Sequence, residues 1–282
     1  MSIRYLFLKI GQFVSLALPE NLAYRAAIFA ADMKRILLPM DRITVRDNLI
    51  AVLGRRDVSH ETKWVFRNFA LYLVDFFRSP KIDKDFISKH IEFVGIENLD
   101  KALSEGKGVI GLSAHIGNWE LGAASLGILG YDINAVAMVH KSKRVNRFFN
   151  DTRSSKGFKT IPLGKALRSC IEVLKRNGIL ALVGDKNFGP NGITVKFFGR
   201  DCLLPKGPAF FHIKMGSPIV PVFMVRTHGD RFKMIFEEPM RFNSTGDEER
   251  DLISITSDYL KVIERYVKLY PEQWFMFRRF WE

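Results

Sequence analysis

The chain is organised around the stretch Gly108-Val109-Ile110-Gly111-Leu112-Ser113-Ala114-His115-Ile116-Gly117-Asn118-Trp119-Glu120. Its apolar residues up to Leu112 predict a short buried strand. Asn118 is a good N-cap for a helix over 119–129, which places Glu120 in the first helical turn. His115 is therefore expected at the carboxyl end of a strand, at the sheet edge where open α/β folds bind their ligands.

The spacing of His115 and Glu120 permits acid–base chemistry. A carboxylate five residues after the histidine can fold back across the turn and hold one ring nitrogen. The other nitrogen of a neutral imidazole can then take a proton from a hydroxyl and make it a nucleophile. A histidine beside a turn is also often structural, and the spacing alone does not separate these alternatives.

The six residues His115-Ile116-Gly117-Asn118-Trp119-Glu120 resemble the signature of the glycerolipid acyltransferase superfamily. The fuller form, which includes Gly117-Asn118-Trp119-Glu120, resembles the lipid A biosynthesis branch of that superfamily, the lauroyl and myristoyl transferases. The resemblance implies transfer of a fatty acyl group from a thioester, on acyl carrier protein or CoA, to a hydroxyl of a lipid A precursor. It implies that His115 is the general base and that Glu120 orients it.

The resemblance also implies substrate contacts around this pair. Asn118 begins the helix whose backbone N–H groups are expected to stabilise the tetrahedral oxyanion. Arg153, which precedes Lys156-Gly157-Phe158, resembles the basic residue of the family's second motif, which holds a phosphate or the oxyanion. No metal or other cofactor is implied, because no other His or Cys is spaced with His115 as a ligand set.

The stretch Val183-Gly184-Asp185-Lys186-Asn187-Phe188-Gly189 resembles the third motif of this family. Asp185 is expected at the end of a buried strand, where it would bind a sugar hydroxyl of the substrate or orient Arg153. Lys186 is also expected to bind the substrate. The alternative for Asp185 is a turn aspartate that bonds its own backbone. Phe197 and Phe198, just downstream, are expected near the acyl chain.

Later motifs are expected to shape the pocket. They are Lys206-Gly207-Pro208-Ala209, Pro218-Ile219-Val220-Pro221, and the closing Pro271-Glu272-Gln273-Trp274-Phe275 with Arg278-Arg279-Phe280. Family members commonly have Trp and His where this chain has Met276 and Phe277, which leaves the acceptor open. A lysophospholipid or other glycolipid acyltransferase would use the same His115 and Glu120. The resemblance covers about residues 90–282.

Composition restricts the partners. The 282 residues are 47% hydrophobic, and 43 basic against 30 acidic residues give a net charge of +13. Such a surface suits an acidic carrier protein, an anionic membrane or nucleic acid. A basic nucleic-acid-binding protein is the alternative from another class, but no helix-turn-helix, RNA-recognition or zinc-finger pattern is present, so no nucleic-acid partner is expected. Cys170 and Cys202 are expected to be reduced and buried, as in a cytosolic protein.

Residues 3–18 are apolar on most sides, but Lys9 and Gln12 interrupt them and Pro19 follows. Sixteen residues at about 1.5 Å each span roughly 24 Å, short of the roughly 30 Å hydrocarbon core. An amphipathic helix on the bilayer surface is favoured over a buried first helix, and crossing with tilt stays open. The expected location is the cytoplasmic face of the bacterial inner membrane, with peripheral or monotopic attachment.

The pattern along the chain predicts an α/β fold, a central and mostly parallel sheet flanked by helices, behind an N-terminal helical membrane-associating extension. The extension is assigned to residues 1–90 and the acyltransferase domain to 91–282, packed as one unit. Strands are predicted over 91–95, 109–114, 133–139, 179–184, 219–225 and 232–237, with a hairpin from 195 to about 203. Helices are predicted over 21–38, 59–77, 97–104, 143–155, 166–176, 206–215 and 247–269.

Overall fold

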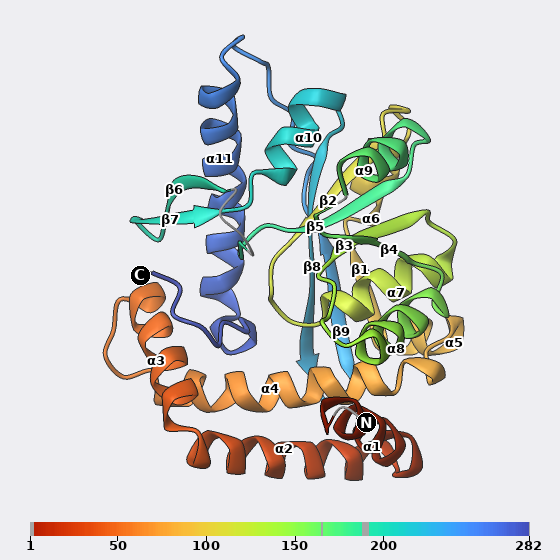
Figure 1. The fold of residues 1–282 in the computed structure, drawn as a ribbon, viewed down its shortest axis with the longest axis vertical. Helices are drawn as coiled ribbons and strands as arrows, with labels where there is room; N and C mark the ends of the chain where they lie inside the picture. Colours follow the sequence, from red (N-terminus) through yellow and green to blue (C-terminus); the bar gives the residue numbers. More distant parts are fainter. Residues whose placement is uncertain (1–2, 165, 188–191, 282) are drawn as a thin grey trace.

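The structure, a computed structural model, describes residues 3–164, 166–187 and 192–281. A seven-stranded sheet with the order β1-β9-β8-β2-β5-β3-β4 forms its centre (Figure 1). These strands are β1 (Ile91–Val94), β2 (Val109–Ser113), β3 (Ile133–Ala137), β4 (Lys159–Pro162), β5 (Ile179–Val183), β8 (Ile219–His228) and β9 (Arg231–Phe236). The five strands from β8 to β4 are mutually parallel, whereas β9 is antiparallel to β8. The predicted mostly parallel sheet is confirmed.

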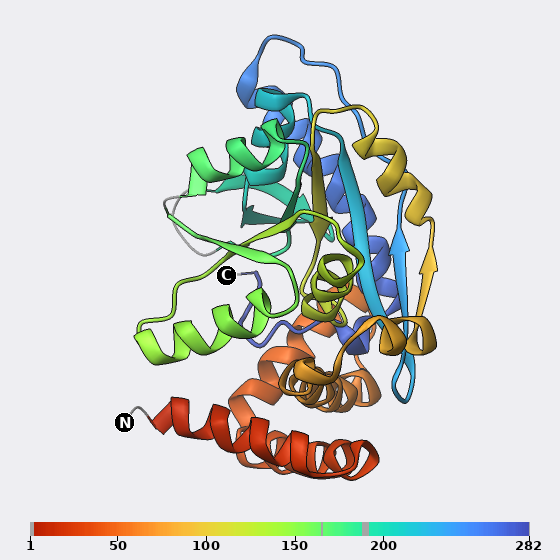
Figure 2. The ribbon, with the colours of Figure 1, turned by 90° about the vertical axis from the view of Figure 1, so that its right-hand side faces the viewer.

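Helices cover both faces of this sheet and one of its ends (Figures 1 and 2). Those within and after the sheet are α6 (Ile96–Leu103), α7 (Trp119–Leu129), α8 (Lys143–Ser154), α9 (Ala166–Lys175), α10 (Gly207–Met215) and α11 (Glu248–Leu269). Those before it are α1 (Ile3–Ala17), α2 (Glu20–Leu37), α3 (Pro39–Leu53), α4 (Ser59–Phe77) and α5 (Lys84–His90), with the 3-10 turn η1 (Ser79–Lys81) after α4 and η2 (Pro271–Gln273) after α11. The predicted strands and helices agree with these bounds within a few residues.

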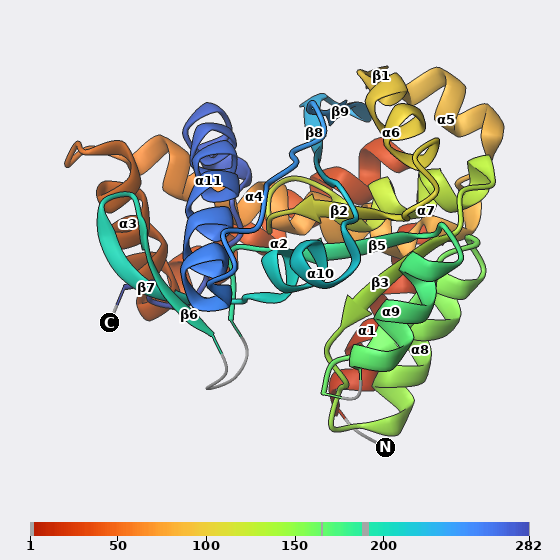
Figure 3. The same ribbon diagram turned by 90° about the horizontal axis from the view of Figure 1, so that it is seen from above.

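The predicted hairpin consists of β6 (Ile193–Phe197) and β7 (Arg200–Leu204), which form a separate two-stranded sheet beside α11 (Figure 3). Helices α3 and α5 and strand β4 were not predicted as separate elements. The buried residues of α3, among them Val45, Leu49 and Val52, have helical spacing, but charged residues between them hide the apolar stripe.

The central strands β2 and β5 are paired in parallel and buried, as continuous apolar runs in parallel sheets usually are. The turn after β2 leads directly into α7, which begins at Trp119 with Asn118 as its N-cap. The Asn118 side chain accepts a hydrogen bond from the backbone N–H of Leu121 at 3.0 Å. The predicted cap, and with it the place of His115 at the end of β2, is confirmed.

The N-terminal helices lie against the carboxyl end of β2 and against the C-terminal tail. Helix α4 runs across this end of the sheet, with α2 beneath it (Figure 1). The Asn68 side chain donates to the backbone oxygen of Glu272 at 2.9 Å. Asn48 on α3 donates to the backbone oxygens of Met276 at 3.1 Å and Arg278 at 2.8 Å. The first and last parts of the chain therefore hold each other in place.

Helices α1 and α2 turn large apolar side chains toward solvent. Phe7, Phe13 and Phe29 are 69%, 72% and 68% exposed. The predicted helix over 3–18 is confirmed as a helix, and the alternative of a buried first helix is wrong for these side chains. Among the described residues, every helix is too short or too polar to cross a membrane.

Gly117 is required by the turn after β2. Its φ is +61°, and a Cβ there would collide with the backbone oxygen of Met224 on β8. Its N–H donates to the backbone oxygen of Gln273 at 2.9 Å, and the N–H of Asn118 donates to that of Met224 at 2.7 Å. The turn can therefore lie against β8 only without a side chain at this position.

We predict that Gly117→Ala lowers the free energy of unfolding much more than Gly54→Ala. Gly54 has a similar φ of +66°, but a Cβ there has nothing within 4 Å. The control should lose only the cost of left-handed backbone, about 1–2 kcal/mol, while Gly117→Ala adds the collision. Urea unfolding of both variants measures the difference, and equal losses would contradict the close approach to β8.

Candidate active site

The site is built at the carboxyl ends of β2 and β5, where two neighbouring parallel strands place His115 and Asp185 side by side. The imidazole Nδ1 of His115 lies 2.7 Å from Asp185 Oδ1. The backbone N–H of His115 also donates to this carboxylate, at 3.1 Å to Oδ1 and 3.0 Å to Oδ2. Ring and backbone of one residue are therefore held by the same acid.

Asp185 is fully buried, and Trp274 Nε1 donates to its Oδ2 at 2.9 Å. Burial by itself raises the pKa of Asp185, but the charge of His115 and the hydrogen bonds from His115 and Trp274 outweigh it and hold that pKa below its usual value. The carboxylate is thus ionised at neutral pH. It favours the His115 tautomer with a proton on Nδ1, which assigns base chemistry to Nε2.

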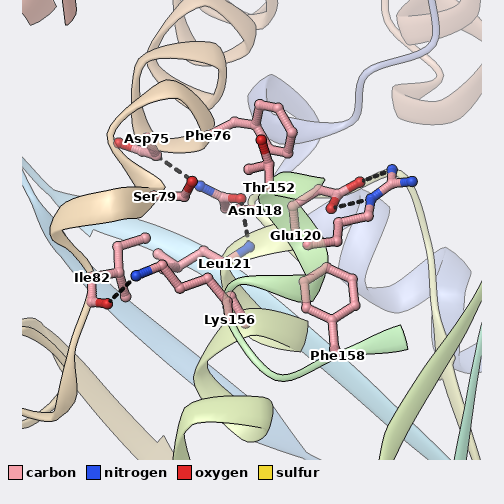
Figure 4. Close-up of a pocket in the computed structure, with 12 residues that line it drawn as sticks. Asp75, Phe76, Ser79, Ile82, Asn118, Glu120, Leu121, Thr152, Lys156 and Phe158 are labelled. Atoms are coloured by element: carbon pink, nitrogen blue, oxygen red, sulfur yellow. Dashed lines mark hydrogen bonds and ion pairs between the residues drawn. The ribbon is translucent and has the colours of Figure 1, made fainter. Parts of the chain in front are cut away.

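Glu120 does not make the predicted contact with the imidazole. Its carboxylate is paired with Arg153, which donates from Nε to Oε2 at 3.0 Å and from Nη2 to Oε1 (Figure 4). Burial lowers the pKa of Arg153, but Glu120 more than compensates and raises it above its usual value. The prediction that Glu120 orients His115 is therefore wrong in this structure, and the partner of the ring is Asp185. Asp185 does not orient Arg153.

The side chain of Asn118 has a second protein partner besides the helix that it caps. It is buried, its Oδ1 caps α7, and its Nδ2 donates to Asp75 Oδ2 at 2.7 Å (Figure 4). Asp75 on α4 also accepts from Tyr24 at 2.7 Å and from the Arg226 guanidinium. Both ends of the Asn118 amide are thus occupied by protein groups, so it supports the turn that carries His115, and its predicted contact with substrate stays a prediction.

A cavity of about 770 Å³ extends from His115 between the sheet and α7. Small residues make room for it: Gly111, Ala181 and Ala135 are paired side by side on β2, β5 and β3, and Gly122 and Ala123 line it from α7. Apolar side chains complete the walls, including Leu126, Phe158, Val222 and Met234. The volume lies within the range of about 300–1,000 Å³ that is usual for small-molecule sites.

Four of the predicted residues, His115, Glu120, Arg153 and Lys186, line this cavity. Burial and the nearby Arg278 lower the pKa of Lys186. Lys206, Gly207 and Pro208 line the cavity as well, as expected of a motif that shapes the pocket.

Phe197 and Phe198 are outside the described lining of the cavity. Phe197 is fully buried and packs edge to face with Phe198 at a centroid distance of 4.6 Å. It also packs with Phe280 at 5.2 Å and joins the core around α11. The prediction that these rings line the acyl chain is therefore wrong for the described cavity. Phe188 and Gly189 of the third motif lie outside the described residues.

Sequence reasoning gave no role to Trp274 or Asp75. Trp274 stood in the closing motif. A buried indole N–H needs a hydrogen-bond acceptor, and this requirement was the available signal that Trp274 contacts a polar group. Asp75 lies on α4 among aromatic residues with two kinds of contact. Phe76 is core, whereas Tyr72 lines the cavity and stacks on Trp119 at 4.8 Å.

A histidine base held by a buried carboxylate, beside a long apolar cavity, is the arrangement of an enzyme that activates a hydroxyl next to an apolar chain. Comparison with known proteins identifies the class. Residues 2–282 match the family model described as bacterial lipid A biosynthesis acyltransferase. The chain belongs to this family, and it is an acyltransferase. The alternative of a nucleic-acid-binding protein is thereby set aside.

Individual relatives agree on this class. A phosphatidylinositol mannoside acyltransferase of Mycolicibacterium smegmatis is 28% identical over 273 residues, 94% of this chain and 87% of that protein. One of Mycobacterium tuberculosis is 28% identical over 63% of this chain and 59% of that protein. A lipid A biosynthesis acyltransferase of Haemophilus influenzae is 23% identical over 68% of this chain and 59% of that protein.

We predict that Asp185→Asn lowers turnover by about 10²–10⁴-fold, because an amide no longer favours the Nδ1-protonated imidazole. Imidazole ¹⁵N chemical shifts would show the altered tautomer of His115. Glu120→Gln is the contrasting variant, since it leaves the bond between His115 and Asp185 in place and should keep the tautomer. A tautomer change in Glu120→Gln but not in Asp185→Asn would contradict the assignment.

Proposed function

We propose that the protein is an O-acyltransferase that moves a fatty acyl group from a thioester to a hydroxyl of a membrane glycolipid, with His115 as general base. The observation that carries this proposal is that His115, paired with Asp185, lines the 770 Å³ apolar cavity. The acyl chain of the donor occupies the cavity, which brings its carbonyl carbon to His115. The donor is a thioester of acyl carrier protein or of CoA.

The reaction starts when His115 Nε2 takes the proton of the acceptor hydroxyl, whose oxygen attacks the thioester carbonyl carbon. The new C–O bond gives a tetrahedral oxyanion, for which Arg153, fixed by Glu120 at the cavity wall, supplies positive charge. The C–S bond then breaks, and the leaving thiolate takes the proton back from the imidazolium. Asp185 stabilises that imidazolium while it lasts.

Two lipids are candidate acceptors of the acyl group, and a different comparison supports each. The family match favours a lipid A precursor. The greater similarity to phosphatidylinositol mannoside acyltransferases, over 94% of the chain, favours a mannosylated phospholipid instead. The two acceptors share a sugar hydroxyl and a phosphate, so one active site suits either. Mass spectrometry of the products formed from both acceptors and from lysophospholipids, offered side by side, distinguishes them.

We place the protein on the cytoplasmic face of the bacterial inner membrane. The support is the exposed apolar surface of α1 and α2, with Phe7, Phe13 and Phe29 turned outward, together with the net charge of +13. Apolar side chains of such a helix enter the boundary between headgroups and acyl chains, and basic residues attract anionic lipids. A surface location also gives the enzyme direct access to lipid acceptors.

We predict that His115→Ala lowers turnover by at least about 10²–10⁴-fold, which is the usual contribution of a general base. The side chain is 16% exposed and lines a cavity, so the fold should be retained. The measurement is acyl transfer from a radiolabelled thioester, with thermal melting as the folding check. His228→Ala, at an exposed histidine, is the matched control. Near wild-type turnover in His115→Ala would refute the mechanism.

We predict that Ala181→Leu shifts the preference of the enzyme to shorter acyl donors. The larger side chain would fill the cavity beside Gly111 and displace two or more methylene groups. At about 0.8 kcal/mol per buried methylene, the ratio of long-chain to short-chain rates should fall about tenfold or more. Rates with a series of acyl thioesters measure this ratio, and the short donors serve as the internal control. An unchanged ratio would show that the chain binds elsewhere.

A further inference from the structure

A second cavity of about 590 Å³ lies between α1, η1 and α8, apart from the catalytic pair. Helices α1 and α8 lie side by side at the base of the molecule (Figures 1 and 2). We call this cavity the α1–α8 groove. Its lining comes from all three elements: Tyr5, Lys9, Gln12, Ser79, Pro80, Arg144, Arg147, Phe148, Asp151, Thr152 and Ser155.

The groove is basic. Lys9, Arg144 and Arg147 line it against the single carboxylate of Asp151. Lys9 donates to Gln12 at 3.2 Å and lies over the Phe148 ring. Among the described residues, neither Arg144 nor Arg147 has a hydrogen-bond or ion-pair partner. Two guanidiniums and one ammonium around one cavity are the chemistry that binds a phosphate group.

Ser79, in the wall of the groove, has a buried hydroxyl that lacks a partner. Ser79 is 5% exposed, and its Oγ makes no hydrogen bond within the described chain. An unpaired buried polar atom is uncommon in native proteins and calls for an explanation. The Oγ is closed off from the α1–α8 groove, and Ser79 also lines the small pocket beside Asp75 and Asn118 (Figure 4), so the argument for a phosphate rests on the three cations.

The position of the groove identifies the source of the phosphate. Tyr5, Lys9 and Gln12 share one face of α1, because their spacing is four and three residues. The residue after each of these is apolar and exposed: Leu6, Ile10 and Phe13. They form a stripe along α1 that is rotated about 100° from the face that lines the groove. A bilayer that receives this apolar stripe would present its headgroups to the mouth of the groove.

We propose that the α1–α8 groove binds the headgroup phosphate of an anionic phospholipid, and that this lipid fixes α1 on the membrane. The inference rests on the proposed surface location and adds a defined lipid site to it. Because α8 also carries Arg153, the occupied groove would hold the helix that supplies the oxyanion charge.

The test uses the full-length protein and dihexanoyl phosphatidylglycerol, a soluble short-chain lipid, in calorimetric titrations. We expect Arg144→Gln with Arg147→Gln to weaken binding about tenfold or more, since each basic residue contributes roughly fivefold. Lys141→Gln with Lys143→Gln is the matched control: it removes the same charge from exposed residues near the start of α8 that are outside the groove lining. It should leave binding within about threefold of wild type.

Ser79→Ala provides a variant without a charge change. It removes an unsatisfied buried group that is closed off from the groove, so the fold should not suffer and lipid binding should stay at the wild-type level. Equal losses in both double variants would show diffuse charge attraction and would overturn the site. Binding of inorganic phosphate as tight as that of the lipid would overturn the assignment to a lipid headgroup.

Vesicles separate this inference from the surface location itself. Phe7→Ser with Phe13→Ser should reduce flotation with both phosphatidylcholine and phosphatidylglycerol vesicles, yet leave the soluble lipid titration unchanged. The Arg144 and Arg147 variants should reduce flotation only with phosphatidylglycerol. If wild-type protein binds neither vesicle while the soluble lipid still depends on Arg144 and Arg147, the surface location fails and the groove stands. A soluble lipid that does not bind at all refutes the groove.

Discussion

The carboxylate of Asp185 is the group on which the site depends. It accepts hydrogen bonds from the backbone and ring of His115 and from the indole of Trp274, so the ends of β2 and β5 and the C-terminal tail meet at one fully buried charge. A buried carboxylate is costly unless such donors surround it. The three segments are therefore fixed relative to one another, and the imidazole keeps one orientation at the edge of the sheet.

The same sheet provides the room for a substrate. Parallel strands buried on both faces usually carry large branched residues, but Gly111, Ala181 and Ala135 form a row of small ones across β2, β5 and β3. The space that they leave ends beside His115. The cavity and the imidazole are thereby aligned by the register of these strands. The small side chains leave part of the core unfilled, and this unfilled space is the cavity.

The helices before β1 support this edge from the other side. Asp75 on α4 binds Tyr24 of α2, Arg226 of β8 and Asn118, the cap of α7. Burial raises the pKa of Asp75, although Arg226 and the hydrogen bonds lower it, so the cluster depends on all of its members. The family match accordingly extends from residue 2 to 282, beyond the region in which the motifs are visible. Helix α4 thus packs against α7 and the C-terminal tail, while α1 and α2 keep large apolar side chains exposed.

The sequence by itself determined the strand, turn and α7 around His115, the cap at Asn118, the alternation that makes an α/β fold, and the family, because these rest on local spacing and periodicity. It did not determine which acid holds the imidazole. Glu120 is five residues away and bonds Arg153, whereas Asp185 is 70 residues away and bonds His115. Only the tertiary structure decided this, because β2 and β5 become neighbours through a strand order that no local pattern encodes. The phenylalanines at 197 and 198 show the same limit, since apolar residues suit a core and a lipid pocket equally, and only packing decides between them.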